Sequence, residues 1–322
     1  MNLKETARDT MEGTTLIWVL LFGSLLYAGL ILWSGAGKFL QLITQIRWTT
    51  LGIVILLVIL GYLLRFVRWH YYLEVLGYDV PLLANLRIYL ASFLMAISPG
   101  KVGEAMKSYF LKKEFSVPAT PTVAGFFCER FTDVLATVLL SGAGFLVYPH
   151  GGWVILAIAL GQGVVLIVLQ RRSWAELLFF GPLERWTPLD RWIEKLREFY
   201  DISGKLLSLQ HILVGTGLGI LSWGLEGLCL YLIVVDFAGE AMIHPAVAVF
   251  IFCASVLLGA ASMLPGGIGG SEAIMIAMLM FFGAQRSLAV STTVLVRFTT
   301  LWFGVIIGAI CWGLSLQKIH VE

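Results

Sequence analysis

Two stretches decide the fold of this chain: SPGKVGEAMKSYF at residues 98–110 and LPGGIGGSEAIMIAM at residues 264–278. Each places proline and glycine in the middle of an otherwise apolar region, 82–113 in the first case and 245–283 in the second. Both residue types interrupt the hydrogen-bond ladder of a helix. We therefore expect two broken hairpins, which a membrane tolerates only where protein or water covers the broken backbone.

The residues around the two stretches repeat at matched spacing. A proline opens the first short helix of each hairpin, 18 residues before the break in one (81 to 99) and 20 in the other (245 to 265). An arginine in the sequence Arg-Phe-Thr follows each break, at Arg130 and at Arg297. These anchors predict an internal repeat with units 48–147 and 211–315.

The composition of the whole chain is that of a membrane protein. Of its 322 residues, 59% are hydrophobic and only 13% are charged, with a mean hydropathy of +0.89 and a net charge of +2. A soluble domain is roughly 25% charged, so the composition excludes a soluble enzyme, a disordered chain and a nucleic-acid binder. We predict an all-α polytopic membrane protein, a single membrane domain over 1–322, with about six transmembrane helices and two re-entrant broken hairpins. The expected spans, each about 20 apolar residues or more, are 15–33, 48–67, 120–147, 151–170, 211–236 and 287–315.

The Lys and Arg residues of the connections set the expected orientation. Segment 171–209 carries seven of them and a stripe of apolar residues, so we place it in the cytoplasm as an amphipathic connector. Counting spans from there predicts cytoplasmic N- and C-termini and opposite orientations for the two repeat units. We expect the membrane to be a bacterial inner membrane. An inverted repeat with discontinuous helices is a recurrent transporter design, with the binding site at the repeat interface.

Charged side chains inside the predicted spans are the candidate site residues. An arginine at membrane depth costs at least ~2.5–3.5 kcal/mol, so Arg130 and Arg297 are expected to face the protein interior with a partner. A carboxylate follows each break within about one turn, Glu104 in the first hairpin and Glu272 in the second. Further acidic residues lie beside Arg130 or in mid-span: Glu129, Asp133 and Glu226, the last a candidate for ion coupling.

We interpret these residues as two half-sites for a membrane lipid with an anionic headgroup. A guanidinium matches phosphate oxygens in a two-pronged geometry, and the start of each second half-helix would aim backbone N–H groups at the same anion. Lys101 adds positive charge, and glycines let the backbone approach the headgroup: Gly100, Gly103, Gly266, Gly267, Gly269 and Gly270. In the alternative interpretation, Arg130–Glu104 and Arg297–Glu272 are salt bridges that only hold hairpin to span.

Four motifs in this order resemble the flippase-like family named after the transmembrane region of lysylphosphatidylglycerol synthase. They are SPGKVGEAMKSYFL at 98–111, ERFTD at 129–133, LPGGIGGSE at 264–272 and VRF at 296–298. The resemblance covers roughly residues 15–315. It implies a module that, in multi-domain relatives, moves an aminoacylated phospholipid between leaflets beside a soluble aminoacyl-transferase or glycosyltransferase domain. These 322 residues contain neither domain, so we expect a stand-alone membrane module without lysylphosphatidylglycerol synthase activity.

The sequence thus favours a lipid transporter, a flippase or scramblase for a phosphate-bearing phospholipid or lipid-linked glycan. No Walker A motif is present, so ATP hydrolysis by this chain is not the expected driver. Two alternatives stay open: a membrane-embedded transferase acting on a lipid headgroup, and a non-catalytic scaffold for a lipid-modifying enzyme. We expect no cofactor, no metal and no catalytic residues, and the sequence leaves the oligomeric state open.

Overall fold

The computed structural model describes residues 21–98, 102–142, 144, 152–171, 190–239 and 242–321, and the chain is helical throughout these ranges apart from short connections. A first helix, Leu21–Ser34, precedes α2. The elements that follow are α2 (Ala36–Gln45), α3 (Trp48–Val75), α4 (Leu82–Ala91), η1 (Ser92–Ile97), η2 (Val102–Ala105), α5 (Met106–Phe115), α6 (Ala119–Gly142), α7 (Gly152–Gln170), α10 (Asp190–Leu206), α11 (Leu209–Ala238), α12 (Pro245–Ala261), α13 (Gly270–Phe281), α14 (Arg286–Arg297), the π-helical turn η5 (Phe298–Trp302) and α15 (Phe303–Val321).

Long apolar helices identify an all-helical polytopic membrane protein, as predicted. Within the described residues, α3, α11 and the continuous run Arg286–Leu314 are long and apolar enough to cross a membrane, with mean hydropathies of 2.5, 1.9 and 2.0. The first helix and α2 make a fourth span if the bent pair is counted as one. Helix α6 lies where the span 120–147 was expected. Its three charged residues, at 129, 130 and 133, make it less apolar than these spanning helices.

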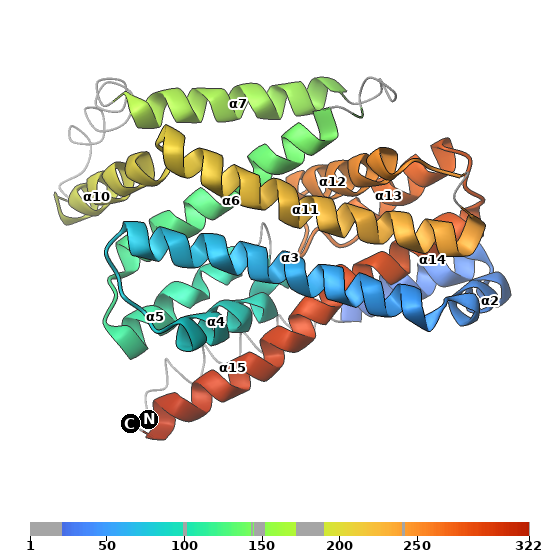
Figure 1. Ribbon diagram of the computed structural model, residues 1–322, viewed down its shortest axis with the longest axis horizontal. Coiled ribbons are helices and arrows are strands. Elements are labelled where there is room, and N and C mark those ends of the chain that lie inside the picture. Colours follow the sequence, from blue (N-terminus) through green and yellow to red (C-terminus); the bar gives the residue numbers. More distant parts are fainter. Residues whose placement is uncertain are drawn as a thin grey trace.

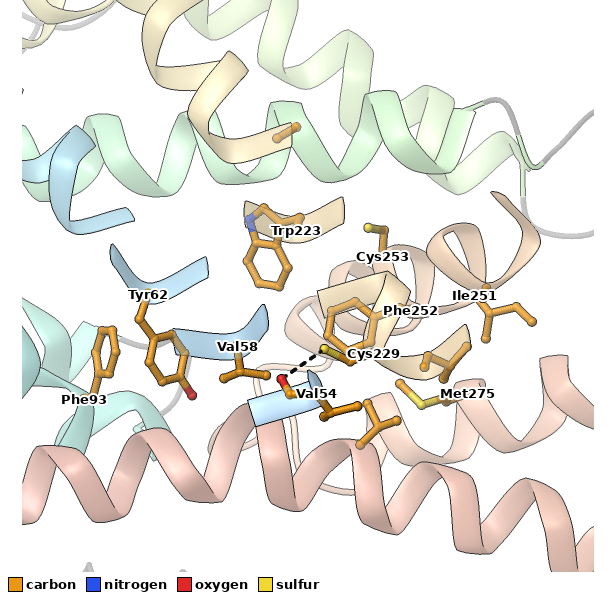
Figure 2. Close-up of a cluster of buried hydrophobic side chains, with 14 of the residues drawn as sticks. Val54, Val58, Tyr62, Phe93, Trp223, Cys229, Ile251, Phe252, Cys253 and Met275 are labelled. Atoms are coloured by element: carbon orange, nitrogen blue, oxygen red, sulfur yellow. Dashed lines mark hydrogen bonds between the residues drawn. The ribbon is translucent and has the colours of Figure 1, made fainter. Parts of the chain in front are cut away.

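Helices α3 and α11 run antiparallel along the long axis of the molecule and form its centre (Figure 1). They approach closely at Gly61, whose carbonyl accepts a 3.0 Å hydrogen bond from Ser222 Oγ. Beside this crossing lies the main apolar core. Figure 2 shows Val54 of α3 facing Cys229 of α11, whose Sγ donates to the Val54 carbonyl at 3.6 Å, with Phe252 of α12 packed nearby.

The two broken hairpins enter the molecule from opposite ends of the long axis (Figure 1). One consists of α4–η1 and η2–α5, and the other of α12 and α13. Their tips meet, because the Gly266 N–H donates to the Ser98 carbonyl at 3.5 Å. The packing is reciprocal: α12 packs on α6 of the first unit, and α4 packs on α15 of the second. Helices of the two predicted units therefore alternate through one core.

The first two elements differ from the prediction of a single span at 15–33. The described part of that span, Leu21–Ser34, turns by 99° into α2, in a region that the sequence reading treated as a plain connection. The turn centres on Gly35, whose φ of 90° lies in a region that glycine adopts without the Cβ clash. Helix α2 is amphipathic, with Phe39 buried and Leu40 exposed.

Helix α3 also departs from its predicted bounds. It continues eight residues beyond the expected end at 67, to Val75. Arg68, one residue beyond the expected end of this span, is consequently fully buried inside the molecule.

The connector 171–209 is described only at Arg171 and from 190 onward. Its helix α10 packs against α6 and α7 rather than standing apart from the bundle. The Tyr200 hydroxyl donates to the Val168 carbonyl at 2.9 Å, and the rings of Phe127 and Phe199 lie 5.5 Å apart. At least part of its apolar face therefore contacts protein.

Candidate functional site

The two predicted half-sites open into one internal cavity. The cavity has a volume of about 190 Å³, and Arg65, Arg130 and Arg297 line it together with Asp133 and Glu226. These residues come from α3, α6, α14 and α11, two helices from each predicted repeat unit. The sequence placed Arg130 and Arg297 in separate half-sites, whereas the structure brings both to the same space.

Part of the cavity lining is apolar. It consists of Val134 of α6 and of side chains of α12 and the residues after it: Phe252, Val256, Leu257, Ala260 and Leu264. Ala260 and Leu264 are exposed on the outside of the molecule. The lining thus combines charged and apolar side chains, and its apolar part reaches the protein surface.

Arg297 is held rigidly at the tip of the second hairpin. Its Nε donates to Glu272 Oε1 at 2.7 Å, and its Nη2 donates to the Gly266 carbonyl at 2.9 Å. Glu272 also accepts hydrogen bonds from the Tyr27 hydroxyl at 2.9 Å and the Gly269 N–H at 2.7 Å. With side-chain exposures of 5% and 1%, this is a closed ion pair that fixes α13 to α14 and to the first helix.

Several backbone N–H groups at this hairpin tip are already engaged. Glu272 caps Gly269, while the N–H groups of Ser271 and Ala273 donate to the carbonyls of Gly267 and Gly269 at 3.0 Å each. The positive φ of Gly266 (60°) and Gly267 (67°) makes this tight turn possible. The sequence reading offered these N–H groups to a bound anion, but the α13 N-terminus is capped by the protein's own carboxylate.

Arg130 is held loosely by comparison. Its Nη2 lies 3.0 Å from Asp133 Oδ2 and 3.5 Å from Glu104 Oε2, and its side chain is 22% exposed. No described residue accepts a hydrogen bond from its Nε. Of the three arginines that line the cavity, Arg130 is therefore the most exposed and the least tightly held.

Asp133 connects Arg130 to two groups that the sequence reading did not place in the site. Its Oδ1 accepts hydrogen bonds from Arg68 Nη2 at 2.7 Å and from Trp223 Nε1 at 3.0 Å. Arg65, one helical turn before Arg68, forms an ion pair with Glu226 and donates from Nε to Ser222 Oγ at 2.6 Å. In the sequence, Arg65 and Arg68 could have been noticed as two arginines three residues apart at the edge of an apolar run.

Glu129 lies apart from the cavity lining, although it is adjacent to Arg130 in sequence. It forms an ion pair with Lys107, and both side chains are fully buried. The Lys107 ammonium lies 3.8 Å from the ring centre of Trp69 and 4.9 Å from that of Tyr89. This pair binds α5 to α6 and occupies Glu129, which the sequence reading had counted with the headgroup site.

The remaining predicted residues lie at the hairpin tips. Gly103 donates its N–H to Ser98 Oγ at 2.7 Å, and a Cβ there would come within 2.8 Å of Met95 Cβ, so its role is close packing. Gly266 and Gly267 line the cavity, while Gly270 packs against Ser262. Gly100 and Lys101 lie outside the described residues.

Comparison with known proteins gives one family model and a set of archaeal relatives. The model, described as the lysylphosphatidylglycerol synthase TM region, matches residues 19–308. A UPF0104 membrane protein of Pyrococcus horikoshii is 26% identical in an alignment that covers 92% of this chain and 93% of the relative. A UPF0104 membrane protein of Methanothermobacter thermautotrophicus is 25% identical over 89% of each chain, and one of Methanocaldococcus jannaschii is 25% identical over 71% of this chain and 97% of its own. Since these relatives are archaeal, a bacterial inner membrane stays a prediction.

Proposed function

This chain belongs to the family of the lysylphosphatidylglycerol synthase transmembrane region, and on that premise we propose that it moves a phosphate-bearing lipid between the two leaflets of a membrane. The cargo headgroup sits in the central cavity during the movement, with its phosphate on Arg130. The chain works as a stand-alone flippase or scramblase module. Its cargo is a phospholipid or a lipid-linked glycan.

The observation that carries this proposal is the mixed lining of the cavity. Three arginines and several apolar side chains line the same space in a membrane protein. A lipid headgroup needs both surfaces, because its phosphate requires charged donors and the attached glycerol and acyl chains require apolar contacts. Arginine is suited to this task since its planar fork contacts two phosphate oxygens at once.

The two hairpins supply a route for access from both leaflets. We propose that the membrane normal follows the long axis, so that the α4–α5 hairpin is re-entrant from one side and the α12–α13 hairpin from the other. Their meeting at Ser98 and Gly266 supports this arrangement, because the cavity then lies near the middle of the bilayer. In this inverted repeat of about six spans, 171–209 and both termini face the cytoplasm.

The two matched arginines have different roles in this mechanism. Arg297 is closed off by Glu272 and Gly266 and acts as a fixed positive wall of the cavity. Arg130 is partly exposed, and its 3.5 Å contact with Glu104 is longer than a charge-assisted hydrogen bond. A phosphate therefore competes for Arg130 and displaces Glu104, while the Arg297 pair stays intact.

Leaflet exchange in sealed proteoliposomes tests the proposal. The experiment follows fluorescent phosphatidylglycerol with a membrane-impermeant quencher, using the full chain and the variant Arg130→Gln. Losing a hydrogen bond between two charged groups costs about 1.5–3 kcal/mol, which predicts a slower exchange by roughly tenfold to a hundredfold. Arg47→Gln is the matched control, because Arg47 forms an ion pair with Asp236 but is 68% exposed and does not line the cavity.

The proposal requires that Arg130→Gln keeps the thermal unfolding midpoint of the starting protein within a few degrees. Equal exchange rates for the starting protein, Arg130→Gln and protein-free vesicles would contradict lipid transport through this cavity. Equal slowing by Arg47→Gln would show that the cavity arginine has no special role.

A further inference from the structure

We propose that Glu104 is a proton-binding site that couples headgroup binding to proton uptake. When a lipid phosphate takes Arg130, one proton from water binds to the Glu104 carboxylate, and it leaves again when the headgroup leaves. This inference rests on the proposed function and adds a coupling ion to it. Three features of the site carry it: the partners of each carboxylate, the charge balance and the groups around Glu104.

Glu104 depends on a single partner. Within the described part of the chain, its one polar contact is Arg130, at 3.5 Å, and its side chain is 5% exposed. The matched residue Glu272 has two hydrogen-bond donors, the Tyr27 hydroxyl and the Gly269 N–H, besides its closed ion pair with Arg297. Losing Arg130 to a phosphate would therefore leave Glu104 as a buried carboxylate without a hydrogen bond, which is the costly state of a buried charge.

The carboxylates that line the cavity have other partners when Arg130 moves. Asp133 loses its 3.0 Å contact with Arg130 but retains Arg68 and Trp223 through its Oδ1. Glu226 retains Arg65, which is also fixed to Ser222. Glu104 is consequently the one carboxylate of the described site that headgroup binding leaves without a polar partner.

The described site is electrically neutral before the headgroup enters. Four arginines face four carboxylates: Arg65, Arg68, Arg130 and Arg297 with Glu104, Asp133, Glu226 and Glu272. The fifth cation, Lys107, is paired with Glu129. A phosphodiester adds one negative charge to this neutral set, and an uncompensated charge away from water costs several kcal/mol. One proton on Glu104 restores neutrality, so the charges balance before and after binding.

The elements packed against Glu104 present few charged groups to it besides Arg130. Element η2 packs against η1, α5 and α6. Segment η1 (SFLMAI) has no titratable side chain, and α5 presents Lys107, which Glu129 of α6 neutralises. Helix α6 further presents Arg130 and Asp133, and Asp133 keeps Arg68 as its partner.

Calorimetry in buffers of different ionisation enthalpy tests the proposal directly. The full chain in detergent is titrated with dihexanoyl phosphatidylglycerol, a soluble phosphodiester lipid, below its critical micelle concentration. The buffer dependence of the heat gives the number of protons taken up, expected to be about one per lipid bound at pH 7. The affinity should then weaken by up to about tenfold for each unit of rising pH.

Two variants assign the proton to its residue. Glu104→Gln, which imitates the protonated carboxyl, should still bind the lipid but take up no proton, with an affinity that is flat in pH. Glu114→Gln is the matched control: Glu114 is a carboxylate with 12% exposure whose ion-pair partner is Arg87 and not Arg130, and its loss should leave the proton number unchanged.

Each result has a distinct meaning. Lipid binding without proton uptake by the starting protein would overturn the coupling while leaving the proposed transport intact. Proton uptake that persists in Glu104→Gln would overturn the assignment to Glu104. Uptake that appears only after Lys101→Gln would mean that this neighbouring lysine neutralises Glu104 instead of a proton. Absence of lipid binding would overturn the proposed function together with this inference.

Discussion

Replacing Arg297 by methionine should destabilise the protein much more than the same change at Arg130. Arg297→Met leaves Glu272 charged and 1% exposed, with only the Tyr27 hydroxyl and the Gly269 N–H as donors. Removing one partner of a buried ion pair typically costs about 3–5 kcal/mol. We therefore expect a loss of this size in the free energy of unfolding.

Arg130→Met leaves fewer groups unsatisfied. Asp133 loses its contact with Arg130 but keeps Arg68 and Trp223, so only Glu104 is left without a partner, and Arg130 itself is 22% exposed. In the coupling proposed above Glu104 then takes up a proton, and a buried neutral group without a partner costs about 1–3 kcal/mol. The two variants should thus differ by roughly 2 kcal/mol, a factor of about 30 in the unfolding equilibrium.

Reversible unfolding in mixed micelles, titrated with a denaturing detergent, measures both losses. A third variant, Arg297→Met with Glu272→Gln, should recover part of the loss because it removes the unpaired charge. Equal losses for Arg297→Met and Arg130→Met would refute the reasoning, since the two ion pairs would then be equivalent. Failure of Glu272→Gln to recover any stability would show that the unpaired carboxylate is not the cause.

Three further predictions concern the packing and the arrangement in the membrane. Gly266→Ala should cost about 1–2 kcal/mol, because φ is 60° there and a Cβ is strained in the left-handed region; an unchanged unfolding titration would contradict this. Lys107→Met should cost about 3–5 kcal/mol by leaving Glu129 buried and unpaired, and the double change with Glu129→Leu should recover most of it; a double variant as unstable as the single one would argue against the pair. In a background without other reactive thiols, Ser116→Cys and Gln285→Cys should react with impermeant reagents from opposite sides of sealed vesicles, and reaction from the same side would contradict the inverted arrangement.

The breaks and their charged partners could be predicted from sequence because their signals are local and repeated. Proline and glycine inside an apolar region mark the two hairpin tips, and matched spacing links each tip to an arginine. The contacts Arg130–Glu104 and Arg297–Glu272 follow from that spacing and are present. The spacing could not predict that the Arg297–Glu272 pair is held more tightly than the Arg130–Glu104 contact. Part of this difference comes from Tyr27, which is 245 residues away from Glu272 along the chain.

Other parts of the site depend on contacts that no sequence period encodes. Arg65 and Glu226 are 161 residues apart and meet where α3 crosses α11. A charged residue near the end of an apolar run is typical of a membrane interface. The sequence therefore placed Arg68 outside the predicted span, whereas helix α3 is longer than predicted and buries it. The 99° turn at Gly35 likewise depends on packing of α2, not on hydropathy alone.

Photo-cross-linking of a lipid headgroup tests most directly the central claim that the headgroup enters the cavity. A phosphatidylglycerol with a diazirine on its headgroup is irradiated in proteoliposomes, and the labelled residues are identified by mass spectrometry. The account predicts labelling of the cavity wall at Val134, Val256 or Leu257, reduced in Arg130→Gln. Labelling confined to outward-facing positions such as Ile310, which is 61% exposed, and unchanged in Arg130→Gln, would contradict it.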